Sequence, residues 1–196
     1  MKTIITSSIA TLAMFFLPFL WNGAGTSCQT TITIGTGTTF NSSTTYPAPY
    51  GNWYWGARHQ ALVRAAELTA SGATAGNITS LAFNVATPNG VALLNFTIKI
   101  KTTATTVLSA FDATGFTTVW GPQNYSETSG WNTHAFSAPF YWDGTSNLLI
   151  ETCFNNSSYT NNAQMYYTAT SYNSVVFVNQ DASGVCSSTA TTSTAV

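Results

Sequence analysis

The chain has 196 residues, of which 6% are charged and 14% are aromatic, and its formal net charge is −1 at pH 7. This composition argues against nucleic acid as a partner, because nucleic-acid binding depends on clustered lysines and arginines and the sequence holds five basic residues. Thr, Val and aromatic residues favour strands, while Asn and Gly favour turns. The composition therefore predicts an all-β protein whose polar surface consists of hydroxyls and amides.

The amino-terminal segment, residues 1–27, has the three parts of a secretory signal peptide. Lys2 supplies the positive charge, Leu12–Trp21 forms an apolar core, and small residues follow it. We place the cleavage between Ala24 and Gln29. A membrane-spanning helix needs about 20 apolar residues, so we expect a secreted or cell-surface protein with no membrane span after cleavage.

Strand-like runs then alternate with turn signals about every 10–15 residues. The run Phe96–Lys101 is the clearest strand, because Phe96, Ile98 and Ile100 alternate with hydrophilic residues. Such a period of two gives the strand one apolar face and one wet face. Further strands are predicted around Ile32 and Ile34 and at Ile78–Val85, Thr117–Trp120, Thr133–Phe136, Leu148–Phe154, Gln164–Thr168 and Val175–Val178.

Gln60–Thr69 is a segment with two interpretations. It fits a short amphipathic helix, and it fits equally a strand at Ala61–Arg64 followed by one helical turn. With about eight or nine strands, residues 28–187 are predicted to form a two-sheet antiparallel β-sandwich of jelly-roll or immunoglobulin-like kind. The Ser/Thr-rich residues 188–196 are expected to be a linker or a truncated end.

Three cysteines are present, and one of them, Cys28, lies beside the cleavage zone, where a lipid anchor is an alternative. The other two are expected to pair as a Cys153–Cys186 disulfide, because an even number of cysteines in an oxidising compartment usually means pairing. Two free buried thiols are the alternative. Neither His59 nor His134 has a Cys or a second His at ligand spacing, so we predict no metal site and no cofactor.

Five aromatic side chains lie within the ten residues from Tyr46 to Trp55. Sugar rings stack on exposed Trp and Tyr side chains, so one interpretation is a ligand-binding platform. The other is that the rings fill one end of the core, because large aromatic side chains are highly buried on average. The candidate platform consists of Tyr50, Trp53, Tyr54 and Trp55.

The six acidic side chains are scattered along the sequence, whereas hydrolysis of a glycosidic bond needs two carboxylates at a defined separation. We therefore predict no catalytic residues. Asp143 is expected to bond its own backbone in a β-turn rather than to bind calcium. Glu151 stands in an apolar strand, where a structural ion pair is the expected role. Its candidate partners are Arg58, Arg64, Lys99 and His134.

The run APFYWDGTSNLLIE, Ala138–Glu151, is the most specific of several stretches that resemble a module of large secreted proteins of Bacteroidota-type bacteria, which are often exported by the type IX route. The resemblance implies a β-sandwich in multidomain, adhesin-like surface proteins, and it implies no catalytic residues. The stretches that carry it are Ile34–Gln60, Glu67–Val85, Phe96–Thr103, Gly130–Asn156 and Asp181–Cys186.

Composition, strand pattern and resemblance together predict a non-catalytic extracellular or cell-surface module that serves adhesion or structural spacing. Its expected partner is a glycan or another surface protein. A carbohydrate-binding module that uses the aromatic cluster is the alternative function. A secreted hydrolase is a third reading, and the residues support it least.

Overall fold

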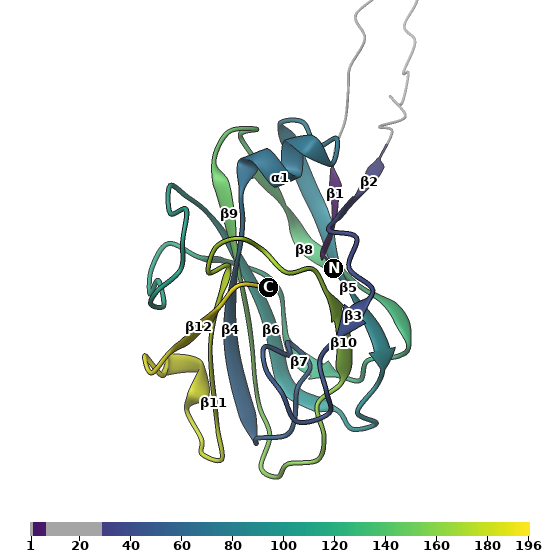
Figure 1. Cartoon of the computed structure of the whole chain (residues 1–196), viewed down its shortest axis with the longest axis vertical. Helices are drawn as coiled ribbons and strands as arrows, with labels where there is room; N and C mark the ends of the chain where they lie inside the picture. Colours follow the sequence, from purple (N-terminus) through teal and green to yellow (C-terminus); the bar gives the residue numbers. More distant parts are fainter. Residues whose placement is uncertain (1, 7–28) are drawn as a thin grey trace, which may run out of the picture.

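The structure is a computed structural model that describes residues 2–6 and 29–196. It consists almost entirely of strands, which form two antiparallel sheets of six strands each (Figure 1). The apolar side chains of both sheets meet in one core between them. The predicted two-sheet β-sandwich is therefore confirmed.

The first sheet has the strand order β2-β1-β5-β10-β3, and β8 pairs with the other edge of β5. Strand β5 is the centre of this sheet. Strands β1 and β10 pair with successive parts of one edge of β5, and β8 pairs with its other edge. The strands are β1 (Lys2–Thr6), β2 (Thr30–Ile34), β3 (Thr39–Phe40), β5 (Gly76–Thr87), β8 (Gly130–Trp142) and β10 (Gln164–Tyr167).

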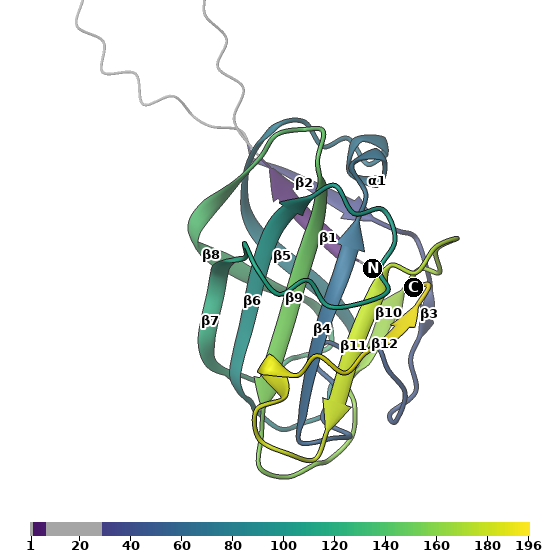
Figure 2. The ribbon, with the colours of Figure 1, turned by 90° about the vertical axis from the view of Figure 1, so that its left-hand side faces the viewer.

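The second sheet has the order β12-β11-β4-β9-β6-β7, and Figure 2 shows these strands side by side. Its central strands β4 and β9 are almost completely buried, because both of their faces are covered. The strands are β4 (Gly56–Val63), β6 (Leu93–Thr103), β7 (Thr117–Tyr125), β9 (Asn147–Asn155), β11 (Val175–Gln180) and β12 (Thr192–Thr194).

The inner face of the second sheet points to the core, and two chain segments cover the outer face. Residues 104–116, between β6 and β7, and residues 181–191, between β11 and β12, both cross it (Figure 2). Apolar side chains fix both segments: Leu108 clusters with Leu62, Leu149 and Val176, and Val185 clusters with Cys153 and Val178. The polar side chains at the centre of this outer face, Arg58, Gln60 and Glu151, are therefore buried.

The ambiguous segment Gln60–Thr69 is a strand followed by a short helix. Strand β4 starts at Gly56, four residues before that segment, and α1 (Ala65–Ala70) follows it. The helical interpretation was wrong because β4 is buried on both faces, so polar and apolar residues do not alternate along it as they do on a strand with one wet face. The Glu67 carboxylate accepts the backbone N–H of Arg64 at 2.8 Å and so caps the start of α1.

The described residues form twelve strands, more than the eight or nine expected, because several are very short. Strand β12 lies in residues 188–196, where we predicted a linker, and it extends the second sheet through its pairing with β11. Strand β1 lies in the predicted signal peptide and pairs with β2 and β5. The apolar core of that peptide, its cleavage zone and Cys28 lie outside the described residues, so export stays a prediction. None of the described helices is long and apolar enough to cross a membrane.

Candidate functional site

The aromatic loop, residues 46–55, folds inward at its centre. Tyr50 is fully buried, its hydroxyl bonds with Nε2 of His134, and its ring packs against Phe83 and Phe96. It therefore belongs to the core, and its place in an exposed platform is corrected. The loop turns inward there because the N–H of Gly51 closes a tight turn on the carbonyl of Ala48 at 2.7 Å.

Tyr46 anchors the start of this loop. Its ring lies 5.8 Å from both His59 and Phe177, nearly parallel to each. Its hydroxyl accepts the N–H of Tyr54 and donates to the carbonyl of Gly51. Burial raises the pKa of Tyr46 above its usual value, so the hydroxyl stays protonated as a donor. The loop is thus held from inside, and Tyr54 is only partly exposed.

Trp53 is the exposed ring of the predicted platform, at 36% exposure. Its neighbour is Tyr159, which is 58% exposed and lies 6.0 Å away, with the two ring planes at 70°. Trp55 is partly exposed, and its backbone N–H is bound by Asp181. The structure therefore brings Trp53 together with Tyr159, which sequence reasoning missed because the two lie on different loops.

Glu151 is the centre of a buried polar cluster on the outer face of the second sheet. Its carboxylate accepts hydrogen bonds from Arg58 at 2.6 and 2.9 Å, Lys99 at 2.8 Å and Gln60 at 2.8 Å. The strand register explains the contact, because Gln60, Glu151 and Lys99 stand opposite one another on β4, β9 and β6. The expected ion pair is confirmed for Arg58 and Lys99. Each member of the cluster is bonded to another, so the cluster joins β4, β9 and β6.

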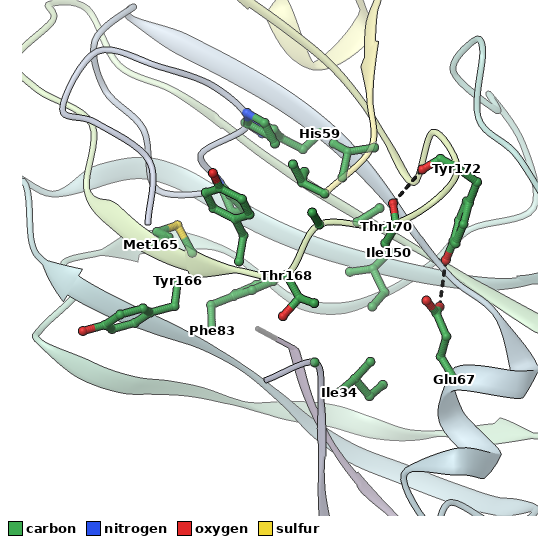
Figure 3. Close-up of a pocket in the computed structure, with 18 of the residues that line it drawn as sticks. Ile34, His59, Glu67, Phe83, Ile150, Met165, Tyr166, Thr168, Thr170 and Tyr172 are labelled. Carbon is green, nitrogen blue, oxygen red and sulfur yellow. Dashed lines mark hydrogen bonds between the residues drawn. The ribbon is translucent and has the colours of Figure 1, made fainter. Parts of the chain in front are cut away.

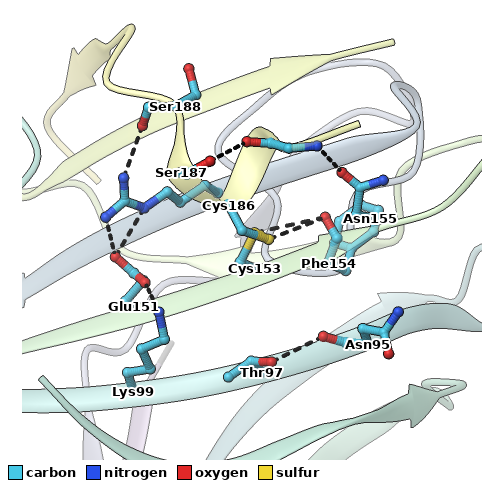
Figure 4. Close-up of a disulfide and its surroundings, with 12 residues drawn as sticks. Asn95, Thr97, Lys99, Glu151, Cys153, Phe154, Asn155, Cys186, Ser187 and Ser188 are labelled. Carbon is cyan, nitrogen blue, oxygen red and sulfur yellow. Dashed lines mark hydrogen bonds and ion pairs between the residues drawn. A yellow bond between two sulfur atoms is a disulfide. The ribbon is translucent and has the colours of Figure 1, made fainter. Parts of the chain in front are cut away.

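The Cys153–Cys186 disulfide lies beside this cluster and confirms the predicted pair (Figure 4). It links β9 to η1 (Val185–Ser187) across the outer face. Arg58 also donates to the carbonyl of Ser188 at 2.8 Å, so the covalent bond and the cluster hold the same segment. The predicted bonding of Asp143 to its local backbone is confirmed as well, because this carboxylate accepts the N–H groups of Thr145 and Ser146.

His134 is surrounded by aromatic rings and is fully buried. Trp120 and Tyr125 have their ring centres 4.5 Å from it. Burial lowers the pKa of His134 to about 4, so the imidazole is neutral at pH 7. Glu127 is also buried, and burial raises the pKa of its carboxyl group while Asn89 donates its backbone N–H to it. Both groups are enclosed in packing and line neither of the two cavities described below.

A cavity of about 380 Å³ lies between the two sheets, at the side where residues 168–174 connect β10 to β11 (Figure 3). This volume lies in the usual range for small-molecule sites. A second cavity, on the outer face, is lined by members of the Glu151 cluster. The inner wall of the first contains His59 and Ala61 of β4, Ile150 and Thr152 of β9, and Phe83 of β5.

The rim of the first cavity is braced by hydrogen bonds. The Tyr172 hydroxyl donates to the Glu67 carboxylate at 2.8 Å, as Figure 3 shows. On the other side, the backbone N–H of Gly37 donates to Oγ1 of Thr168 at 2.7 Å. A Cβ atom at Gly37 would lie 1.8 Å from the carbonyl oxygen of Tyr167, so only glycine allows this approach. The rim is therefore a closely packed part of the fold.

Among residues 2–6 and 29–196, no three His, Cys, Asp or Glu side chains gather in a way that could hold a metal ion. No protein-family model matches the chain, and searches of the curated proteins and of the solved structures find no match either.

Proposed function

We propose that the chain is a non-catalytic extracellular or cell-surface module that serves adhesion or structural spacing. The observation that carries this proposal is that the carboxylates of the chain are bonded to groups of its own fold. Each of the six acids accepts at least one hydrogen bond from a group that fixes the fold. The acids are Glu67, Asp112, Glu127, Asp143, Glu151 and Asp181.

Carboxylates used in this way support a structural role, and the one buried carboxylate oxygen without a partner among the described residues, Oε2 of Glu127, lines neither of the two cavities. The disulfide supports the extracellular part of the proposal, since disulfides persist in oxidising compartments. The covalent bond also ties η1 to β9.

The location is tested by protease treatment of intact cells that produce the full chain. Loss of the protein from intact cells, with a cytoplasmic marker preserved, is the expected result. The non-catalytic part is tested with chromogenic glycosides, esters and peptides. The proposal would be contradicted if wild type turned over one of these substrates and Glu151→Gln did not, with both proteins equally folded by circular dichroism.

A glycan-binding role is the second candidate, and the exposed Trp53 and Tyr159 favour it. Their planes differ by 70°, so one ring can stack on a sugar while the other borders it. Asn52 and Thr160 are the sequence neighbours of the two rings, and the side-chain amide of Asn52 donates to Oγ1 of Thr160 at 3.0 Å, which holds the two loops together. This candidate differs from the predicted platform, because Tyr50 takes no part in it.

A glycan array probed with the full chain tests the second candidate. Binding should fall at least about tenfold in Trp53→Ala and Tyr159→Ala, which corresponds to about 1.4 kcal/mol or more. Tyr141→Ala is the matched control, since Tyr141 is also an exposed aromatic residue, at 64% exposure, and lies on β8. Equal losses in all three variants, or no glycan bound by wild type, would remove this candidate.

A further inference from the structure

Two residues that line the cavity between the sheets each have one buried polar atom without a partner among the described residues. His59 Nδ1 and Thr152 Oγ1 have no hydrogen bond to any residue that the structure describes, and each residue is 2% exposed. The two residues stand opposite each other on β4 and β9, which places their Cβ atoms about 5 Å apart. Buried polar groups are nearly always hydrogen-bonded, so this pair points to a partner that the chain does not supply.

The hydrogen bonds of His59 identify its free nitrogen as a donor. Nε2 accepts the backbone N–H of Ala48 at 3.1 Å, so the single proton of the neutral ring is on Nδ1. Burial lowers the pKa of His59 to about 3, which keeps the ring neutral at pH 7. The hydroxyl of Thr152 can donate as well. One oxygen atom with two lone pairs can therefore accept from both groups.

The rest of the cavity wall defines the body of the missing partner. Most of the wall is aliphatic or aromatic, and it includes Ile34, Phe83, Ile150, Met165 and Val175. Such a wall favours an apolar body, because burying it removes apolar surface from water. The carboxylate on the rim, Glu67, disfavours a negatively charged ligand by like-charge repulsion.

We propose that this cavity binds a small neutral molecule with an apolar body and one carbonyl oxygen, such as a ketone, an ester or a lactone. The oxygen accepts hydrogen bonds from Nδ1 of His59 and Oγ1 of Thr152, and the body packs against the aliphatic and aromatic wall. The binding forms and breaks no covalent bond. This proposal is independent of the adhesive role, and failure of either leaves the other standing.

The test compares two molecules of nearly equal shape with the full chain. They are 2-acetylnaphthalene, which carries a carbonyl, and 2-isopropenylnaphthalene, in which a CH₂ group replaces the oxygen. Isothermal titration calorimetry gives the Kd of each. Wild type is expected to bind the ketone about tenfold or more tightly than the alkene, because two buried donors are satisfied by the ketone alone.

Two variants remove the donors one at a time. Thr152→Val keeps the shape of the side chain, and His59→Phe keeps an aromatic ring between Tyr46 and Phe177. Each is expected to reduce the preference for the ketone by about threefold or more. Trp53→Ala, outside the cavity, is the control and should keep the wild-type preference. If His59→Phe does not fold, the isosteric Thr152→Val decides the question.

The proposal is overturned if wild type binds neither molecule. It is also overturned if wild type binds both with equal Kd, because a retained water would then satisfy the two donors. A preference for the ketone that persists in Thr152→Val and His59→Phe would overturn it as well, since the oxygen would then be bound elsewhere.

Discussion

The two faces of the second sheet use buried polar residues in opposite ways. On the outer face, Arg58, Gln60 and Glu151 bond to one another and to the segments that cover them. On the inner face, their immediate neighbours His59 and Thr152 each keep one polar atom without a partner. All five residues are less than 9% exposed. Burial alone therefore does not distinguish the polar groups of the two faces, whereas hydrogen-bond pairing does.

The largest effect is expected when the outer face is broken at its centre. Glu151→Ala leaves the guanidinium of Arg58 buried without its counter-charge. Unfolding in urea should show a loss of about 3–5 kcal/mol. The double variant Arg58→Met with Glu151→Leu removes both charges and should recover much of this loss. Equal losses in the single and double variants would contradict a paired cluster.

The next largest effect is expected from the covalent part of the outer face. Cys153→Ser with Cys186→Ser opens a loop whose ends are 33 residues apart. The chain-entropy model gives a loss of about 3–4 kcal/mol in the free energy of unfolding. Chemical reduction of wild type should lower the stability by the same amount. A reduced wild type that is as stable as the oxidised protein would refute this expectation.

A smaller and pH-dependent effect is expected from the buried histidines. Burial lowers the pKa of His59 to about 3 and of His134 to about 4, so the unfolded chain binds protons that the folded chain does not. Stability should thus fall as the pH drops from about 6.5 towards 4, by up to about 1.4 kcal/mol per pH unit for each histidine. Glu127, whose raised pKa has the same cause, contributes the opposite slope.

The contribution of each histidine follows from the difference between a variant and wild type, in which the slope of Glu127 cancels. His59→Phe and His134→Phe should each lower the slope of unfolding free energy against pH. The measurement is chemical denaturation at several pH values. A slope that neither variant changes would show that the imidazoles remain protonated inside the fold.

The smallest effect is expected on the inner face. Thr152→Val replaces a hydroxyl that has no partner among the described residues by a methyl group. Its effect on the free energy of unfolding should be within about 1 kcal/mol and can be stabilising, because no hydrogen bond is lost. Thr152 is adjacent to Glu151 in β9, so the two variants compare neighbouring residues of equal burial. A loss as large as that of Glu151→Ala would contradict the comparison.

Local patterns were sufficient for much of the fold. Phe96–Lys101 alternates because one face of β6 meets the core, and this alternation predicts the strand directly. The pair Cys153 and Cys186 followed from counting the cysteines of a chain whose sequence predicts export. Strand β4 was ambiguous because the cover over its outer face hides the alternation, and that cover comes from residues far away in the sequence.

The candidate sites depend on contacts between residues far apart in the chain, which the sequence does not reveal. Tyr50 and Trp53 are similar aromatic residues in one loop, and their different burial results from the position of His134 on β8. The meeting of His59 with Thr152 results from the register between β4 and β9. No spacing along the chain signals that register, so the cavity is visible only in the structure.

Cleavage of the predicted leader would also change the first sheet, because the leader contains β1. Among the described strands, β2 pairs with β1 alone, and β1 also pairs with Ile78–Phe83 of β5. If the leader is cleaved as its sequence predicts, the mature chain loses this strand and β5 gains a vacant edge. Backbone groups of a buried strand need hydrogen-bond partners, so β2 or a strand from another chain has to occupy the vacancy. Maturation would then be a strand replacement as well as a proteolytic step.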